Sequence, residues 1–289
     1  MNEARNMDPT ISRQPNKTDP QETRIRSILD SLASTEESKL MIQKLTTLQK
    51  DFLNNSLQNL DDKDSIKNSY RSLLQNLAEV SKTHIVSGIE NLSKLKSEKH
   101  FIIATNHFGS AKMTRIPSSE LVVDSPIEEI EPFPIRHAPF VAIEKITGNK
   151  IFECAVELPQ PFSKIQDAAG IVVVPSSGEG RTQKLINSIE KLNTKEERTA
   201  VVMYPEGGTT GKRNDGGAYD LDVFRSGTFV VAAKLKLLIL PVCQIFDPNE
   251  GIKLTILEPI SVTEDDLGNV DKKLSDLKTS MQESLKKNS

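Results

Sequence analysis

The sequence predicts an α/β protein whose mixed, mostly parallel sheet is flanked by helices and preceded by a small helical subdomain. From about residue 100 onward, short apolar runs rich in β-branched residues alternate with segments of helical pattern, as expected of strands that helices cover on both faces. Residues 23–98 contain no proline and a single glycine, and their apolar residues recur at helical spacing. We therefore expect a disordered leader over residues 1–22, a helical subdomain over 23–98 and an α/β domain over 99–289.

The leader is polar and contains three prolines, and no apolar segment follows its first charged residues, so it does not resemble a signal peptide. The helical subdomain should hold three or four helices that pack through apolar stripes. Asp62 or Asp64 is a candidate N-cap for the third stripe. The stripes are Ile25, Ile28 and Leu32; then Met41, Leu45, Leu48 and Phe52; then Ile66, Tyr70, Leu73, Leu77 and Val80.

Five segments of the α/β domain are predicted to be strands. Four are short apolar runs, and the last alternates between apolar and polar residues, which indicates a strand with one solvated face. In chain order they span residues 101–104, 171–174, 200–204, 237–240 and 253–257. Between and after them, helices are expected over residues 182–192, 229–235 and 264–289.

The composition excludes several classes of protein. Of the 289 residues, 36% are hydrophobic, which is enough to bury a core and too many for a disordered chain. The net charge of −3, from 37 basic and 40 acidic residues, gives no overall field that would attract nucleic acid. No apolar run approaches the roughly 18 residues of a membrane-spanning helix, and the two cysteines form no C-x-x-C pair of the kind that binds zinc. We expect a soluble reducing compartment, cytoplasmic or plastid-like, or a peripheral position on a membrane.

Ligand sites of α/β sheets form at the carboxyl ends of strands, so the residues that follow each apolar run are the candidates for function. His107 follows the first run, beside a loop glycine. An imidazole there can be held by backbone hydrogen bonds and still meet solvent, and its ordinary pKa of about 6.5 suits a general base. The alternative is a hydrogen-bonded structural histidine, which is what we expect of His84, His100 and His137.

Two other loops carry charged groups beside glycines. The third run leads into Glu206, two glycines, two threonines and the cations Lys212 and Arg213. Successive glycines expose backbone N–H groups that can bind an anion, although the glycine spacing does not match a nucleotide P-loop. The second run leads into residues 175–181, where Arg181 and the glycines could bind a phosphate. The alternative for the loop after the third run is an ordinary glycine turn, and for the loop after the second run it is a plain connection to the helix at Thr182.

The order and spacing of these loops resemble the glycerol-3-phosphate and lysophosphatidic-acid acyltransferase family over roughly residues 98–262. The family's first block, Asn-His-x4-Asp, is matched at its start by Thr105-Asn106-His107, and its third block, Phe-Pro-Glu-Gly-Thr, is similar to residues 204–210, with one extra glycine. Downstream, Phe224-Arg225-Ser226-Gly227-Thr228-Phe229 and Pro241-Val242 follow the family pattern of an aromatic, basic residues, a glycine, an apolar helix and a strand ending in Pro-Val.

This resemblance implies an O-acyltransferase of glycerolipid synthesis. A histidine would deprotonate a hydroxyl of glycerol 3-phosphate or a related acceptor, which attacks an acyl thioester on coenzyme A or acyl carrier protein. No cofactor, metal or nucleic acid is implied. By the same resemblance, His107 would be the base with an orienting acid. Glu206 and Gly207 would belong to the acceptor site, with Arg181 as a stand-in for the family's second-block arginine. Further candidates for substrate binding are Gly208, Thr209, Lys112, Lys212 and Arg213.

The sequence departs from the family at the orienting acid, because Lys112 stands where the first block has aspartate. A lysine cannot accept a hydrogen bond from the imidazole N–H. Either another acid replaces it, with Asp124 as the expected residue and Asp220 and Asp222 as alternatives, or turnover is slow or absent. Two other functions therefore stay open: a catalytically weakened relative that binds acyl chains or phospholipid, and an unrelated α/β enzyme with a phosphate-bearing ligand.

Overall fold

The computed structural model describes residues 27, 30–31, 33–109, 113–123, 128–131, 133–174, 180–208, 210 and 217–288. Its centre is a seven-stranded sheet in the order β1-β9-β8-β2-β7-β5-β6. Every neighbouring pair is parallel except β8 and β9, which are antiparallel. The mixed, mostly parallel sheet is therefore confirmed. Its strands are β1 (His84–Ser87), β2 (His100–Thr105), β5 (Lys150–Val156), β6 (Val172–Val174), β7 (Thr199–Met203), β8 (Leu238–Asp247) and β9 (Gly251–Ile256).

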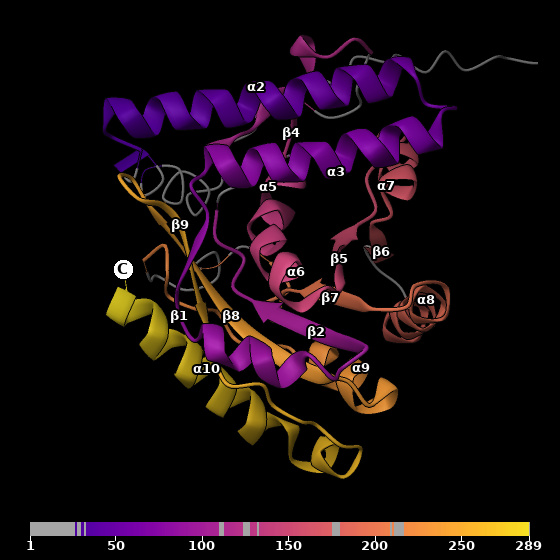
Figure 1. Cartoon of the computed structure of the whole chain (residues 1–289), viewed down its shortest axis with the longest axis vertical. Helices are drawn as coiled ribbons and strands as arrows, with labels where there is room; N and C mark the ends of the chain where they lie inside the picture. The colour runs from indigo at the N-terminus through magenta and orange to yellow at the C-terminus, as the bar shows by residue number, and fades with distance from the viewer. Residues whose placement is uncertain are drawn as a thin grey trace, which may run out of the picture.

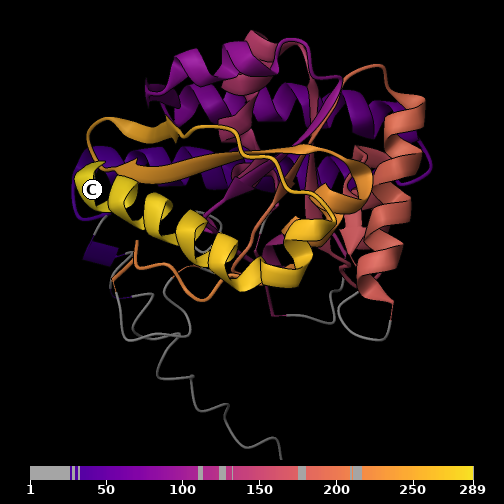
Figure 2. The ribbon, with the colours of Figure 1, turned by 90° about the horizontal axis from the view of Figure 1, so that it is seen from below.

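Helices cover both faces of this sheet (Figure 1). One face packs against the N-terminal helices and the helices that precede β5 and β6. These are α2 (Glu36–Gln58), α3 (Lys63–Val80), η1 (Ile89–Leu95), α5 (Pro134–His137), η3 (Ala138–Phe140), α6 (Val141–Thr147) and α7 (Phe162–Ala169). The other face packs against α8 (Arg181–Lys195), α9 (Gly227–Leu235) and α10 (Val270–Asn288), which follows η4 (Asp265–Asn269). Figure 2 views the molecule from this second face, with α10 in front of the sheet.

The helical pattern of the N-terminal region is confirmed over residues 36–80. Thr35 caps α2 by accepting the Ser38 N–H at 3.1 Å, and Asp62 caps α3 by accepting the Ser65 N–H at 2.9 Å. The helices pack on the sheet directly, because their buried side chains, such as Leu77, join those of β2 in one core. The division of the chain at residue 98 stays a prediction, and the leader lies outside the described residues.

Three strands or strand pairs were not predicted. Strand β1 lies within the range expected to be helical; it is short, and it pairs in parallel with β9, with Ile85 opposite Leu254. Strand β5 escaped prediction because the charged Lys150 and Glu153 interrupt its apolar run. The two-residue strands β3 (Ile116–Pro117) and β4 (Glu129–Ile130) form a separate antiparallel pair near η2 (Ser118–Glu120). Over the described ranges, no helix combines the length and the apolar character needed to cross a bilayer.

Candidate functional site

The site lies at the carboxyl ends of β2 and β7, which are adjacent and parallel, with Ala104 opposite Met203. His107 and Glu206 follow these strands, and the His107 backbone N–H donates to Oε1 of Glu206 at 3.3 Å. The Thr210 N–H donates to the His107 carbonyl oxygen at 3.0 Å. The turn that carries the imidazole and the turn that carries the glutamate are thus hydrogen-bonded to each other at one edge of the sheet, as the sequence predicts.

Asn106 explains how the chain leaves the sheet just before the imidazole. Its side-chain amide donates to the Gln244 carbonyl oxygen at 3.0 Å and accepts the Gln244 N–H at 2.8 Å. The side chain of Asn106 therefore bonds the backbone of Gln244 on β8 as the backbone of a neighbouring strand would, and Asn106 is fully buried. The side chain of Asn106, and not its backbone, makes these bonds. The strand pairing of β2 therefore ends at Thr105, and His107 follows outside the strand.

Glu206 is fully buried and is the common acceptor for several donors. Besides the His107 N–H, its carboxylate accepts the Thr210 hydroxyl at 2.5 Å and the Asp222 N–H at 2.8 Å. Burial raises the pKa of Glu206 to about 7, even though these hydrogen bonds lower it, and the neighbouring Asp222 carboxylate adds to the rise. The carboxylate therefore links three chain segments and titrates near neutral pH.

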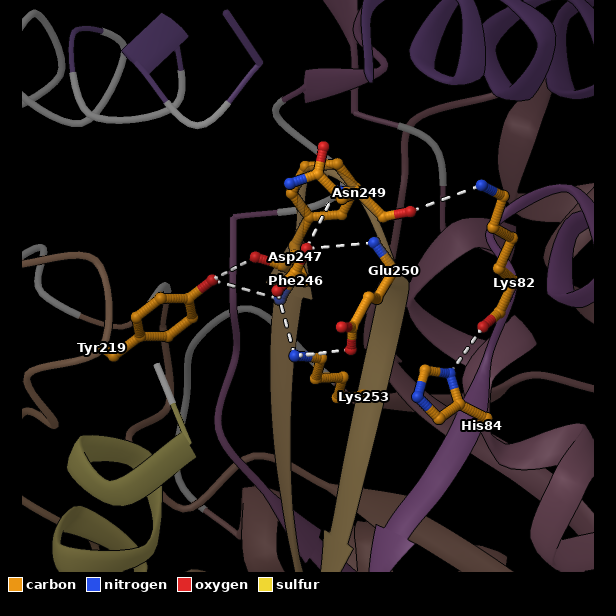
Figure 3. Close-up of polar contacts among 8 residues, drawn as sticks. All are labelled: Lys82, His84, Tyr219, Phe246, Asp247, Asn249, Glu250 and Lys253. Atoms are coloured by element: carbon orange, nitrogen blue, oxygen red, sulfur yellow. Dashed lines mark hydrogen bonds and ion pairs between the residues drawn. The ribbon is translucent and has the colours of Figure 1, made fainter. Parts of the chain in front are cut away.

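The segment that carries Asp222 is fixed to β8 by Tyr219 (Figure 3). The Tyr219 hydroxyl donates to the Phe246 carbonyl oxygen at 3.0 Å and accepts the Phe246 N–H at 3.1 Å. Its ring also stacks on Phe108, one residue after the candidate base, with ring centroids 5.1 Å apart. Beyond it, Lys253 forms ion pairs with acidic residues of the β8–β9 hairpin. Tyr219 thus anchors to β8 the segment whose Asp222 N–H donates to Glu206.

Gly207 forms the turn directly after the glutamate, with φ at +62°. A side chain there would be strained, because L-residues rarely adopt this conformation. An added Cβ would also lie 3.0 Å from Cδ of Arg225, whose backbone N–H donates to the Pro205 carbonyl oxygen at 2.8 Å. The glycine therefore leaves room for the Arg225 side chain, which lies against the turn. Arg225 is thus a cation of the site, whereas the sequence indicates it only as part of the segment that resembles the family.

The imidazole of His107 contacts two side chains, Tyr204, which directly follows β7, and Arg136 of α5. Its ring lies edge-on to the Tyr204 ring, with centroids 4.8 Å apart. Nη1 of Arg136 lies 3.1 Å from Nε2 of His107. The imidazole is buried, with 8% of its surface exposed. The structure thus brings a guanidinium to the ring at the nitrogen that a general base would use.

Arg136 itself is held by a buried carboxylate. Its Nε lies 3.1 Å from Oε1 of Glu153 on β5, and the Tyr204 hydroxyl donates to the same oxygen at 3.3 Å. Glu153 is fully buried, and burial raises its pKa to about 7 although Arg136 lowers it. Burial, the largest single influence, would lower the pKa of Arg136, but Glu153, Tyr204 and other nearby acidic groups together raise it. His107, Arg136, Glu153 and Tyr204 therefore form one polar network under the site.

The titration of Glu153 gives a test of this network. Its pKa is about 7 in the folded chain and 4.5 ordinarily, so the folded state holds the proton more tightly, and stability present below about pH 4.5 is lost as pH rises to about 7. We expect Glu153→Gln to lack this loss, because the amide oxygen keeps the acceptor position without a charge. Urea unfolding from pH 5 to pH 8 should show the wild-type stability falling by about 2–3 kcal/mol relative to the variant. Parallel curves for the two proteins would contradict the raised pKa.

Other predicted site residues lie apart from the imidazole or outside the described residues. Arg181 begins α8, which follows β6, and β6 lies three strands from β2 in the sheet. The second loop therefore follows an edge strand, and the expectation that Arg181 joins the other groups stays a prediction. Gly208 follows Gly207 in the described turn. Lys112, Asp124, Thr209, Lys212 and Arg213 lie outside the described residues.

The two alternative orienting acids have described positions. Asp220 accepts the Gly217 N–H within its own turn. Asp222 is buried and contributes its backbone N–H to Glu206, so its carboxylate lies beside that residue. The described hydrogen bond of the His107 ring is with a cation, Arg136.

Sequence reasoning missed Arg136, Glu153 and the role of Arg225. A signal for Glu153 exists, since it occupies a core-facing position between the buried Ile151 and Ala155. A carboxylate in such a place is rarely buried unless it is paired. No comparable pattern marks Arg136, which lies between prolines in a loop-like segment.

Comparisons with known proteins add no relative. No family model matches the chain, and no curated protein matches it.

Within the part of the chain that the structure describes, no group of three or more His, Cys, Asp or Glu side chains is arranged to hold a metal ion.

Proposed function

We propose that the protein is an O-acyltransferase that moves a fatty acyl group from an acyl thioester to a hydroxyl of glycerol 3-phosphate or a related acceptor. The observation that carries the proposal is the hydrogen bond between the His107 turn and Glu206 at the carboxyl ends of adjacent parallel strands. The sequence resemblance assigns these residues to the base and the acceptor site, and their meeting at one edge supports that assignment.

The chemistry follows from the position of the imidazole. Nε2 of His107 accepts the proton of the acceptor hydroxyl as its oxygen attacks the thioester carbonyl carbon. An ester C–O bond forms, the C–S bond breaks, and the imidazolium returns its proton to the departing thiolate of coenzyme A or acyl carrier protein. Glu206 and the Gly207 turn would hold the acceptor. Arg225, which crosses that turn, supplies a positive charge for a phosphate.

The test is acyl transfer from acyl-CoA and from acyl carrier protein to glycerol 3-phosphate, with His107→Ala compared with the wild type. We expect the variant to lose at least about 100-fold in rate, because general bases contribute this much or more. His84→Ala is the matched control, since His84 is exposed on the edge strand β1 and should leave the rate unchanged.

Each result separates the candidate functions. Equal rates for His107→Ala and the wild type would remove the imidazole from the chemistry. Tight binding of acyl chains or phospholipid without turnover would instead favour the catalytically weakened relative. A thermal shift with nucleotides but none with acyl donors would point to the unrelated phosphate-ligand enzyme. A ligand at 100 times its Kd should stabilise the fold by about 2.7 kcal/mol.

A further inference from the structure

The contact between Arg136 and His107 determines where the imidazole carries its proton. A guanidinium has only N–H donors, so Nε2 of His107, 3.1 Å from Nη1, must be the acceptor. An imidazole that accepts at Nε2 is neutral and carries its proton at Nδ1. This is the same tautomer that an orienting carboxylate selects when it accepts the Nδ1 proton of a catalytic histidine.

The arginine is held in this position from two directions. On the side of the sheet, Glu153 pairs with its guanidinium, and the Tyr204 hydroxyl donates to the same Glu153 oxygen. On the side of the N-terminal helices, the residues on each side of the arginine are hydrogen-bonded to α2 and α3. The Ile135 N–H donates to Oε1 of Gln49 on α2 at 3.1 Å, and Nδ1 of His137 lies 3.0 Å from the Tyr70 hydroxyl of α3.

We propose that Arg136 is a positioning residue that fixes His107 in the tautomer whose Nε2 is unprotonated. Its effect on turnover rests on the proposed function, whereas its effect on the tautomer does not. The acceptor hydroxyl replaces the Arg136 N–H at Nε2 when the substrate binds, and Glu153 keeps the guanidinium paired after that release. The helices α2 and α3 thereby support the chemistry, because they hold the residues that flank Arg136 in α5.

The tautomer can be read directly by nitrogen-15 NMR of the imidazole side chains at a pH where His107 is neutral. The chain has only four histidines, so single His→Gln variants assign the signals. We expect the wild-type His107 to carry its proton at Nδ1. In Arg136→Met we expect the Nε2–H tautomer to appear, since the donor that excluded it is gone.

Two further variants keep the result independent of folding defects. Arg136→Met combined with Glu153→Gln removes both charges of the pair and should show the same tautomer change. Arg198→Met is the matched control, because Arg198 is a part-buried guanidinium bonded to Asn149 at the opposite end of β7, and the His107 signals should stay unchanged.

A wild-type His107 that carries its proton at Nε2 would overturn the proposal. So would an Nδ1–H tautomer that persists in both Arg136 variants. In the acyl-transfer assay, kcat of the Arg136 variants should fall by between about 10-fold and 10⁴-fold, the upper value being the cost of a wrong tautomer in a serine protease triad. If the wild type transfers no acyl group while the tautomer responds to Arg136, the proposed function fails and the positioning role stands.

Discussion

Glu206→Ala is expected to destabilise the fold by about 2–4 kcal/mol and to reduce acyl transfer as strongly as the loss of His107 does. The carboxylate accepts the backbone N–H groups of His107 and Asp222 and the hydroxyl of Thr210, all of which are buried. Each buried donor without an acceptor costs about 1–3 kcal/mol. Removing a buried charge, whose cost is visible in the raised pKa of Glu206, offsets part of this loss.

Urea unfolding at pH 7, combined with the acyl-transfer assay, checks both parts of this expectation. Glu190→Ala is the control, since Glu190 is exposed on α8 and its removal should change the free energy of unfolding by less than about 0.5 kcal/mol. If Glu206→Ala matches that control in stability, the glutamate does not hold the turns together. If it destabilises but keeps the full transfer rate, the acceptor role of Glu206 is wrong.

Gly88→Ala is expected to cost about 3 kcal/mol or more. Gly88 lies between β1 and η1 with φ at +78°, and an added Cβ would lie 1.8 Å from the Ile256 carbonyl oxygen at the end of β9. Such a separation is far below any van der Waals contact, and the obstructing atom belongs to the backbone, so β1 or β9 must move. The overlap adds to the roughly 1–2 kcal/mol that a left-handed conformation costs an L-residue.

Gly148→Ala separates the two causes. Gly148 also has a left-handed backbone, with φ at +71°, but an added Cβ would meet no atom within 4 Å. Its substitution should therefore show the conformational cost alone. Thermal unfolding of the two variants measures the difference. If both lose the same stability, the close approach to Ile256 does not constrain this position.

The architecture was predictable where local pattern and burial agree. Strands β2 and β7 are continuous apolar runs because both of their faces are covered, and each matches its predicted range to within one residue. The predicted run at 237–240 begins β8, but the strand continues to Asp247 because its antiparallel pairing with β9 extends it. Strand β1 could not be recognised from four residues, since its only support is a partner far along the chain.

The candidate site was predictable only along β2 and β7. Parallel strands end at the same edge of the sheet, so the proximity of His107 and Glu206 could be predicted from strand order alone. The Arg136–Glu153 pair depends instead on how the four-residue helix α5 lies beside β5, and so short a helix shows no periodic pattern in a single sequence. The second loop follows β6, which lies at the edge of the sheet, and its part in the site stays a prediction.

Strand β2 is bordered on both sides by strands that occur much later in the chain, β7 and β8. During ribosomal synthesis it therefore emerges with two open edges of apolar backbone and stays so until both partners have been made. Pairings of such high contact order form slowly, and open strand edges invite aggregation. The final steps of assembly enclose β2 between its neighbours and, in doing so, create the edge at which the backbone N–H of His107 meets Glu206.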